Sequence, residues 1–132
     1  MAGLFATGWD HILTGTATLG GDSLSASPSF RLQYSLVMPA AAGILEEATL
    51  RGIMQLRTER YVGSMPSQLL AGLLFIVAHG QQMLEIRHLL FLTLLASVTG
   101  WIAGRSRAAW PASLLHGAVN FLIATVVLAC RT

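Results

Sequence analysis

Three ionisable residues interrupt an apolar stretch in the first half of this chain, and this interruption constrains the fold more than any other feature. Glu46, Glu47 and Arg51 lie between the apolar runs 36–45 and 50–56. A charge at membrane depth costs roughly 2.5–3.5 kcal/mol on insertion scales, so such residues usually face a bundle interior or a wet site. A surface helix with a local ion pair would need polar flanks, which the sequence lacks.

The composition favours a membrane protein. Of 132 residues, 54% are hydrophobic and only 11% are charged, whereas a soluble domain averages about 25% charged residues. At about 20 residues per span, the length allows four transmembrane helices. We therefore predict an all-α membrane protein, a bundle of about four transmembrane helices with a polar intramembrane cavity. The net charge of +2 is too small to indicate nucleic-acid binding.

The chain divides into a short lead-in and one membrane core. Residues 1–29 are rich in Gly, Ser and Thr, and are predicted to form a loop-like or interfacial N-terminal segment. Residues 30–132 are predicted to form a single core, whose helices span about 30–57, 67–84, 89–104 and 110–130. Pro111 suits the first turn of the last helix, where its missing N–H costs nothing.

Glycines and prolines indicate breaks and close contacts within the core. Pro39 and Gly43 predict a kink just before the two glutamates, and the polar segment 58–66 predicts a turn. Gly100 and Gly104 are four residues apart, a spacing that permits a close helix contact.

Polar residues from three predicted helices fall in one layer of the bundle. Glu46, His79 and Asn120 lie about 15–18 Å from the same end, and His116 lies about 9 Å from it, at 1.5 Å rise per residue. A carboxylate, two imidazoles and an amide could activate a water and stabilise a tetrahedral oxyanion. A single intramembrane His or Asn is often only a contact between helices, so the functional interpretation depends on the set.

The spacing of the charged residues also predicts a pair. Glu47 and Arg51 are four residues apart on one helix and can form an ion pair, which makes Arg51 a structural counter-ion. Glu46 lies about 100° around the helix from Glu47, so the two carboxylates need not have the same role. Phe75, taken alone, is predicted to be a packing residue.

Three short motifs follow one another along the apolar helices. They are Glu46-Glu47-Ala-Thr-Leu-Arg51, Phe75-Ile-Val-Ala-His79 and His116-Gly-Ala-Val-Asn120. In this order they resemble the motifs of the CAAX-protease and bacteriocin-processing (CPBP) intramembrane proteases, also called the abortive-infection family. The resemblance covers about residues 36–125.

The resemblance implies a peptide hydrolase embedded as a multi-pass protein in the bacterial cytoplasmic membrane. It makes Glu46 the general base, assisted by His79, with His116 and Asn120 at the oxyanion and with Glu47, Arg51 and Phe75 in supporting positions. Some family members are described as metalloproteases, and a metal-free glutamate mechanism is also argued. If a divalent metal such as zinc binds, its ligands would be Glu46, His79 and His116, although the sequence has no His-Glu-x-x-His motif.

The implied substrate is a membrane-associated peptide or a CAAX-like tail in the lipid bilayer. Relatives usually carry further helices before the glutamates, so a homo-oligomer or a partner that completes the bundle is also expected. Two other functions stay open: a non-catalytic immunity or scaffold protein that binds a partner or peptide in the same cavity, and a small transporter or ion-pathway subunit in which these groups relay protons.

Overall fold

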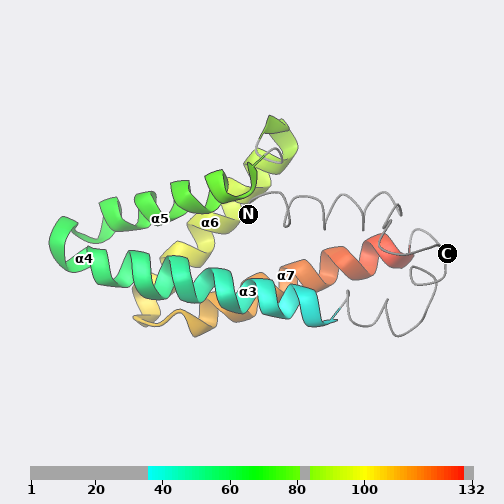
Figure 1. The fold of residues 1–132 in the computed structure, drawn as a ribbon, viewed down its shortest axis with the longest axis horizontal. Helices are drawn as coiled ribbons and strands as arrows, with labels where there is room; N and C mark the ends of the chain where they lie inside the picture. Colours follow the sequence, from blue (N-terminus) through cyan, green and yellow to red (C-terminus); the bar gives the residue numbers. More distant parts are fainter. Residues whose placement is uncertain (1–35, 81–83, 130–132) are drawn as a thin grey trace.

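The computed structural model describes residues 36–80 and 84–129, which are helical apart from short turns. The predicted N-terminal segment 1–29 lies outside the described residues, as do 30–35, 81–83 and 130–132. Three consecutive segments, α3, η2 and α4, follow one another without a break and form one rod. The described part of the chain therefore folds into four helical rods, as the sequence predicted (Figure 1).

The first rod changes its helical geometry directly after the two glutamates. It comprises α3 (Met38–Glu47), the π-helix η2 (Ala48–Gln55) and α4 (Leu56–Val62). Leu56 N–H donates to the carbonyl of Arg51, five residues back, which is the π pattern. The break was predicted at Pro39 and Gly43, but α-helical geometry continues through both. A π segment of this kind often marks a functional site.

The first rod ends later in the sequence than predicted, and the turn after it is shorter. The helix continues to Val62, because Glu59 and Arg60 are good helix formers despite their polarity. The turn is made at Gly63, whose φ of 86° lies in the left-handed region that glycine adopts without a steric cost. The prediction of a turn over 58–66 was therefore wrong at both of its ends.

The other rods begin and end within a few residues of their predicted positions, with one exception. They are α5 (Ser64–Ala78), α6 (Ile86–Ser106) and α7 (Trp110–Ala129), and Pro111 lies in the first turn of α7 as predicted. The exception is the end of α5, which was predicted at residue 84. Gly80 has a φ of 58°, which is typical of the residue after a helix C-cap, so α5 ends at Ala78 with His79 as its C-cap.

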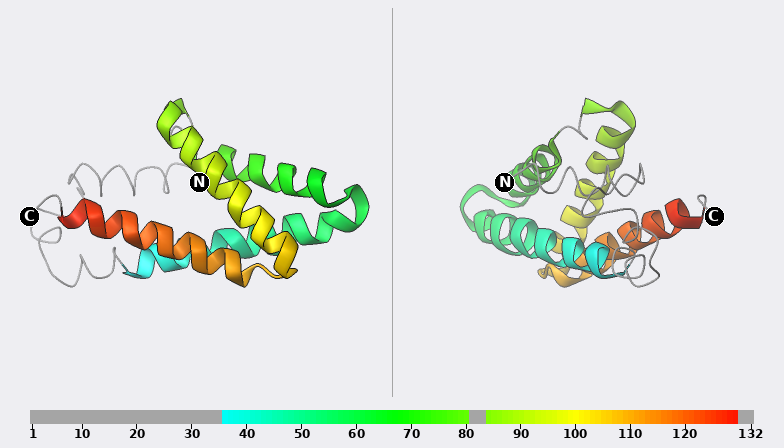
Figure 2. Two further views of the ribbon diagram at one scale, coloured as in Figure 1. Left: turned by 180° about the vertical axis from the view of Figure 1, so that it is seen from behind. Right: turned by 45° about the vertical axis from the view of Figure 1, so that its right-hand side comes forward.

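Two glycines allow α3 and α7 to pack closely. The two helices lie side by side in Figures 1 and 2. A Cβ atom on Gly43 would come within 2.8 Å of the backbone nitrogen of Gly117. Glycine is required at this crossing, because α7 backbone occupies the place of a side chain.

Gly43→Ala is accordingly expected to destabilise the bundle by about 1–3 kcal/mol, the usual cost of overpacking. Gly72→Ala is the matched control, because its Cβ would meet the Ala96 Cβ at 3.8 Å, an ordinary van der Waals contact. Thermal unfolding in detergent compares the two variants. Equal melting temperatures for both would contradict the close contact between α3 and α7.

A close helix contact was predicted at Gly100 and Gly104, but the atoms nearest to these glycines belong to side chains. Gln55 of η2 lies against both glycines, and its Nε2 donates to the carbonyl of Gly100 at 2.7 Å. Gln68 of α5 reaches the same place, so that a Cβ on Gly100 would lie 2.9 Å from the Gln68 Cγ. The two glycines therefore make room for glutamine side chains rather than for a helix backbone.

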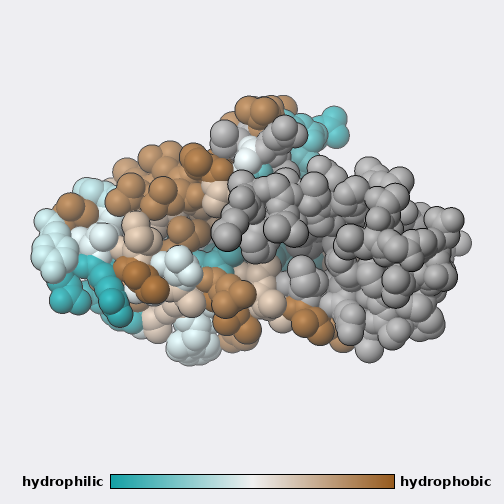
Figure 3. Space-filling model, in the orientation of Figure 1, coloured by the Kyte–Doolittle hydropathy of each residue, from teal (hydrophilic) through white to brown (hydrophobic). Residues whose placement is uncertain are grey.

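In this bundle charged side chains are buried and many large apolar side chains are exposed, which is the reverse of the usual arrangement in a soluble protein. Glu47, Arg51 and Thr99 have no exposed surface, while large apolar side chains cover much of the outside (Figure 3). A small apolar cluster of Phe75, Leu92, Leu95 and Ala96 lies beside the polar interior. Within the described ranges, α6 is the helix that is long and apolar enough to cross a membrane.

Candidate active site

The first motif places a buried ion pair at the centre of the bundle. Arg51 Nε donates to Glu47 Oε2 at 3.0 Å, and neither side chain has any exposed surface. The pair lies where α3 passes into η2, so both residues come from one rod. The ion pair predicted from their spacing is confirmed.

Helix α6 supplies further hydrogen-bond acceptors to the guanidinium group, although Arg51 Nη1 has none within the described residues. Thr99 Oγ1 accepts hydrogen bonds from Arg51 Nε at 3.2 Å and from Nη2 at 2.9 Å, and the Ala96 carbonyl accepts from Nη2 at 3.3 Å. The guanidinium carbon also lies 5.6 Å from the ring centroid of Phe75, within cation–π range. None of the α6 contacts was anticipated from the sequence.

The third motif brings His116 of α7 onto the free oxygen of Glu47. His116 Nδ1 lies 3.0 Å from Glu47 Oε1, and the imidazole is buried. A carboxylate paired with arginine can only accept, so Nδ1 must carry the proton and donate it. Glu47 therefore fixes the orientation of the ring, and Nε2 points away from it.

The other nitrogen of His116 faces Glu46. Nε2 lies 4.0 Å from Glu46 Oε2, and the Glu46 side chain is 31% exposed. Within 36–80 and 84–129, Glu46 Oε2 is buried and makes no hydrogen bond. The two adjacent glutamates thus have different surroundings. Both oxygens of Glu47 accept hydrogen bonds from protein side chains, whereas Glu46 Oε2 accepts none within the described residues and lies beside an imidazole.

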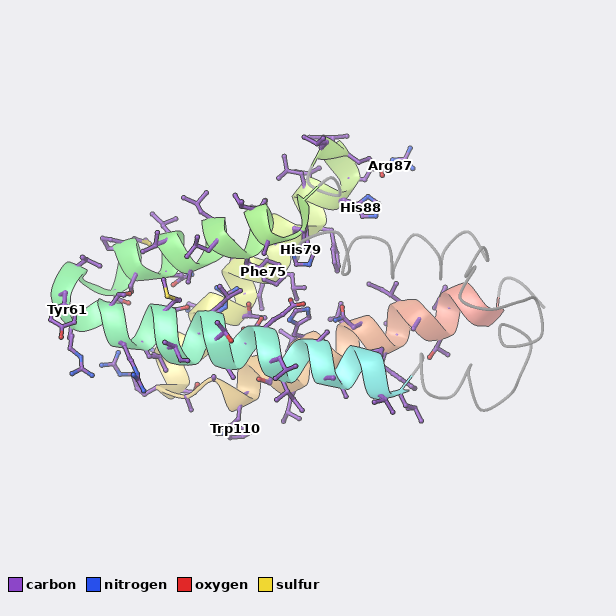
Figure 4. All side chains as sticks on the ribbon, viewed as in Figure 1. Tyr61, Phe75, His79, Arg87, His88 and Trp110 are labelled. Atoms are coloured by element: carbon purple, nitrogen blue, oxygen red, sulfur yellow. The ribbon has the colours of Figure 1, made fainter. Side chains whose placement is uncertain are left out.

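The second motif lies at the end of α5. His79 is the C-cap residue, and its Nδ1 lies 2.8 Å from the carbonyl of Phe75. The Phe75 ring is 4.6 Å from the ring of His79 and 5.5 Å from that of His116, centroid to centroid. Figure 4 shows Phe75 and His79 pointing from α5 toward α3. Phe75 therefore packs between the two imidazoles and the guanidinium group.

Asn120 is the predicted site residue with the weakest link to the others. It lies one turn after His116 on α7 and is half-buried. No hydrogen bond joins its amide to another side chain in the part of the chain that the structure describes. Its place in the site rests on the helical spacing from His116.

The predicted polar cavity is not seen among the described residues. The polar groups pack against one another, and the hollow beside them is apolar. It has a volume of about 290 Å³ and is lined by Leu36, Ala40, Ile44, Ser113, Leu114, Gly117, Ala118 and Phe121 of α3 and α7. Within the described residues, the polar groups of the interior form a hydrogen-bonded cluster.

The residues named above do not form a ready metal site. Within the described ranges, no three His, Cys, Asp or Glu side chains are grouped closely enough to hold an ion. The conditional ligand set of Glu46, His79 and His116 therefore stays an expectation, in which His116 would bind through Nε2, since its Nδ1 is bound to Glu47.

Carboxylates and imidazoles buried inside an apolar helical bundle are typical of membrane proteins in which these residues have a function. The family model of the type II CAAX prenyl endopeptidase Rce1-like proteins matches residues 28–122. The chain belongs to this family, whose members are membrane-embedded proteases, and the CPBP resemblance inferred from the three motifs is confirmed. The sequence matches no curated protein and no solved structure.

Proposed function

We propose that this chain is an intramembrane endopeptidase that hydrolyses a peptide bond of a membrane-associated peptide, with a CAAX-like tail as the substrate class. The observation that carries the proposal is the 4.0 Å separation of Glu46 Oε2 and His116 Nε2, with His116 held in place by Glu47. A water that bonds to both atoms would be oriented for attack on a carbonyl.

The cluster formed by Glu46, Glu47, Arg51 and His116 has a net charge that depends on one proton. Two carboxylates meet one guanidinium group and one imidazole, so the cluster is neutral when a single proton is shared between Glu46 and His116. A buried cluster with uncompensated charge would be much less stable. With Glu46 ionised and His116 protonated, the site contains both a base and a donor.

This protonation state supports a balanced hydrolysis. Glu46 accepts a proton from water as the water oxygen bonds to the scissile carbonyl carbon. The oxyanion that forms is stabilised by N–H of His116 Nε2 and by the amide of Asn120. The protonated Glu46 then donates to the leaving nitrogen, and the C–N bond breaks. His79, beside Phe75, assists in orienting the water.

The proposal is tested with the full chain purified in detergent and incubated with a mixture of prenylated and membrane-tethered peptides. Mass spectrometry identifies the products, and Glu46→Gln is the paired control. Cleavage by the native protein alone is the expected result. The proposal is wrong if a folded native protein leaves every peptide intact, or if Glu46→Gln gives the same products.

A further inference from the structure

Thr99 of α6 lies outside the three motifs, yet its hydroxyl oxygen accepts two hydrogen bonds from the charged cluster. Its side chain has no exposed surface, and its oxygen accepts from both Nε and Nη2 of Arg51. Arginine has no acceptor, so the single hydroxyl proton must be donated elsewhere. It goes to the Leu95 carbonyl at 2.9 Å, which leaves the oxygen lone pairs directed at Arg51.

The hydroxyl of Thr99 is connected to His116 and Glu46 through Arg51 and Glu47. Arg51 Nε is shared between Thr99 Oγ1 and Glu47 Oε2. With the guanidinium group anchored to α6, Glu47 presents Oε1 to His116 Nδ1. The ring of His116 then directs Nε2 toward Glu46. One hydroxyl on α6 is in this way connected to the reacting groups on α3 and α7.

We propose that Thr99 is a positioning residue of the peptidase site, acting through Arg51 and Glu47 on the orientation of His116. This inference rests on the proposed function. Thr99 does not touch the reacting atoms, so its effect is on geometry rather than on proton transfer. A misplacement of about 1 Å caused by a change outside the reacting groups can cost about 10²-fold in rate.

Two substitutions separate positioning from packing. Thr99→Val keeps the shape and volume of the side chain but removes the acceptor for Arg51. Thr99→Ser keeps the hydroxyl but removes a methyl group from a buried position. A packing role predicts that the valine variant is the better enzyme, and a positioning role predicts that the serine variant is.

Thr93→Val is the matched control, because Thr93 lies on the same helix and its hydroxyl bonds only the Leu89 carbonyl, at an exposed position. Steady-state kinetics use the full chain in detergent and a peptide that the native protein cleaves. We expect kcat to fall about 10–100-fold in Thr99→Val with KM changed less than about threefold, and Thr99→Ser and Thr93→Val to stay within about threefold of native.

A second measurement needs no enzymatic activity. The imidazole nitrogen signals of ¹⁵N-histidine report whether His116 Nδ1 is bound to Glu47, and we expect them to move in Thr99→Val and not in Thr93→Val. Native kcat together with native His116 signals in Thr99→Val would overturn the inference. If the native chain cleaves no peptide, the proposed function fails, while the nitrogen signals still test the role of Thr99. Should Thr99→Val not fold, Thr99→Cys takes its place, since a thiol is only a weak acceptor.

Discussion

Glu46→Gln is expected to reduce kcat by about 10²–10⁴-fold, which is the usual contribution of a general base. The amide keeps the size and shape of the carboxylate but cannot accept a proton from water. The same change is expected to leave the melting temperature unchanged or to raise it. Glu46 Oε2 is buried with no hydrogen bond in the described residues, so its charge costs stability in the native protein.

This combination of lost activity and retained stability separates a catalytic role from a structural one. Glu59→Gln is the matched control, because Glu59 lies on α4 far along the rod and pairs with the exposed Arg107. Its activity is expected to equal that of the native protein. A Glu46→Gln variant that cleaves at the native rate would remove Glu46 from the mechanism. A variant that loses activity only because it unfolds would make Glu46 a structural residue.

Arg51→Met is expected to destabilise the protein by about 3–5 kcal/mol, because it removes one partner of a buried pair. Glu47 would keep its charge with no exposed surface and only His116 as a partner. Thermal or denaturant unfolding in detergent measures the loss. Arg107→Gln removes the partner of an exposed pair and should change stability by less than about 1 kcal/mol. Similar effects of the two substitutions would contradict the buried pair.

The double variant Glu47→Leu with Arg51→Met gives a further test of this pair. Replacing both charges of a buried pair by apolar side chains is often neutral or stabilising. The double variant should therefore regain much of the stability that Arg51→Met loses. Hydrolysis should stay lost, because His116 Nδ1 no longer has the acceptor that orients its ring. Recovery of both stability and activity would show that Glu47 is not needed to position His116.

Local features of the fold followed from the sequence wherever one residue controls them. Pro111 marks the start of α7, and the spacing of Glu47 and Arg51 predicted their pair. Helix ends were harder, because polar residues such as Glu59 were interpreted as a turn although they favour a helix. The π segment Ala48–Gln55 has no sequence signal, since it depends on packing against α5 and α6.

The site was predictable where motifs exist and not where contacts run between distant helices. The motifs located Glu46, Glu47, Arg51 and His116, which the structure brings together. Thr99 was missed because an isolated threonine in an apolar helix has no pattern that distinguishes it from packing. Thr99 lies 48 residues from Arg51 in the sequence, so only the tertiary structure reveals their contact.

The sequence led us to expect a polar cavity, which the described residues do not show. Residues at one depth were taken to line a shared space, but depth does not determine whether side chains face water or one another. Here Glu47 bonds to Arg51 and His116, and Arg51 bonds to α6, which satisfies most of their polar atoms. Glu46 Oε2 and Arg51 Nη1 make no hydrogen bond within the described residues, and of the two only the carboxylate can accept a proton from water.

The most direct test of the account is cleavage carried out in H₂¹⁸O. The purified native chain is incubated with the prenylated and membrane-tethered peptides, and the products are weighed by mass spectrometry beside those of Glu46→Gln. We predict one ¹⁸O atom in the new carboxyl group of each N-terminal fragment that the native chain produces, and no such fragment with Glu46→Gln. A folded native chain that yields no labelled product, or a Glu46→Gln variant that yields as much, would contradict hydrolysis by a water that Glu46 activates.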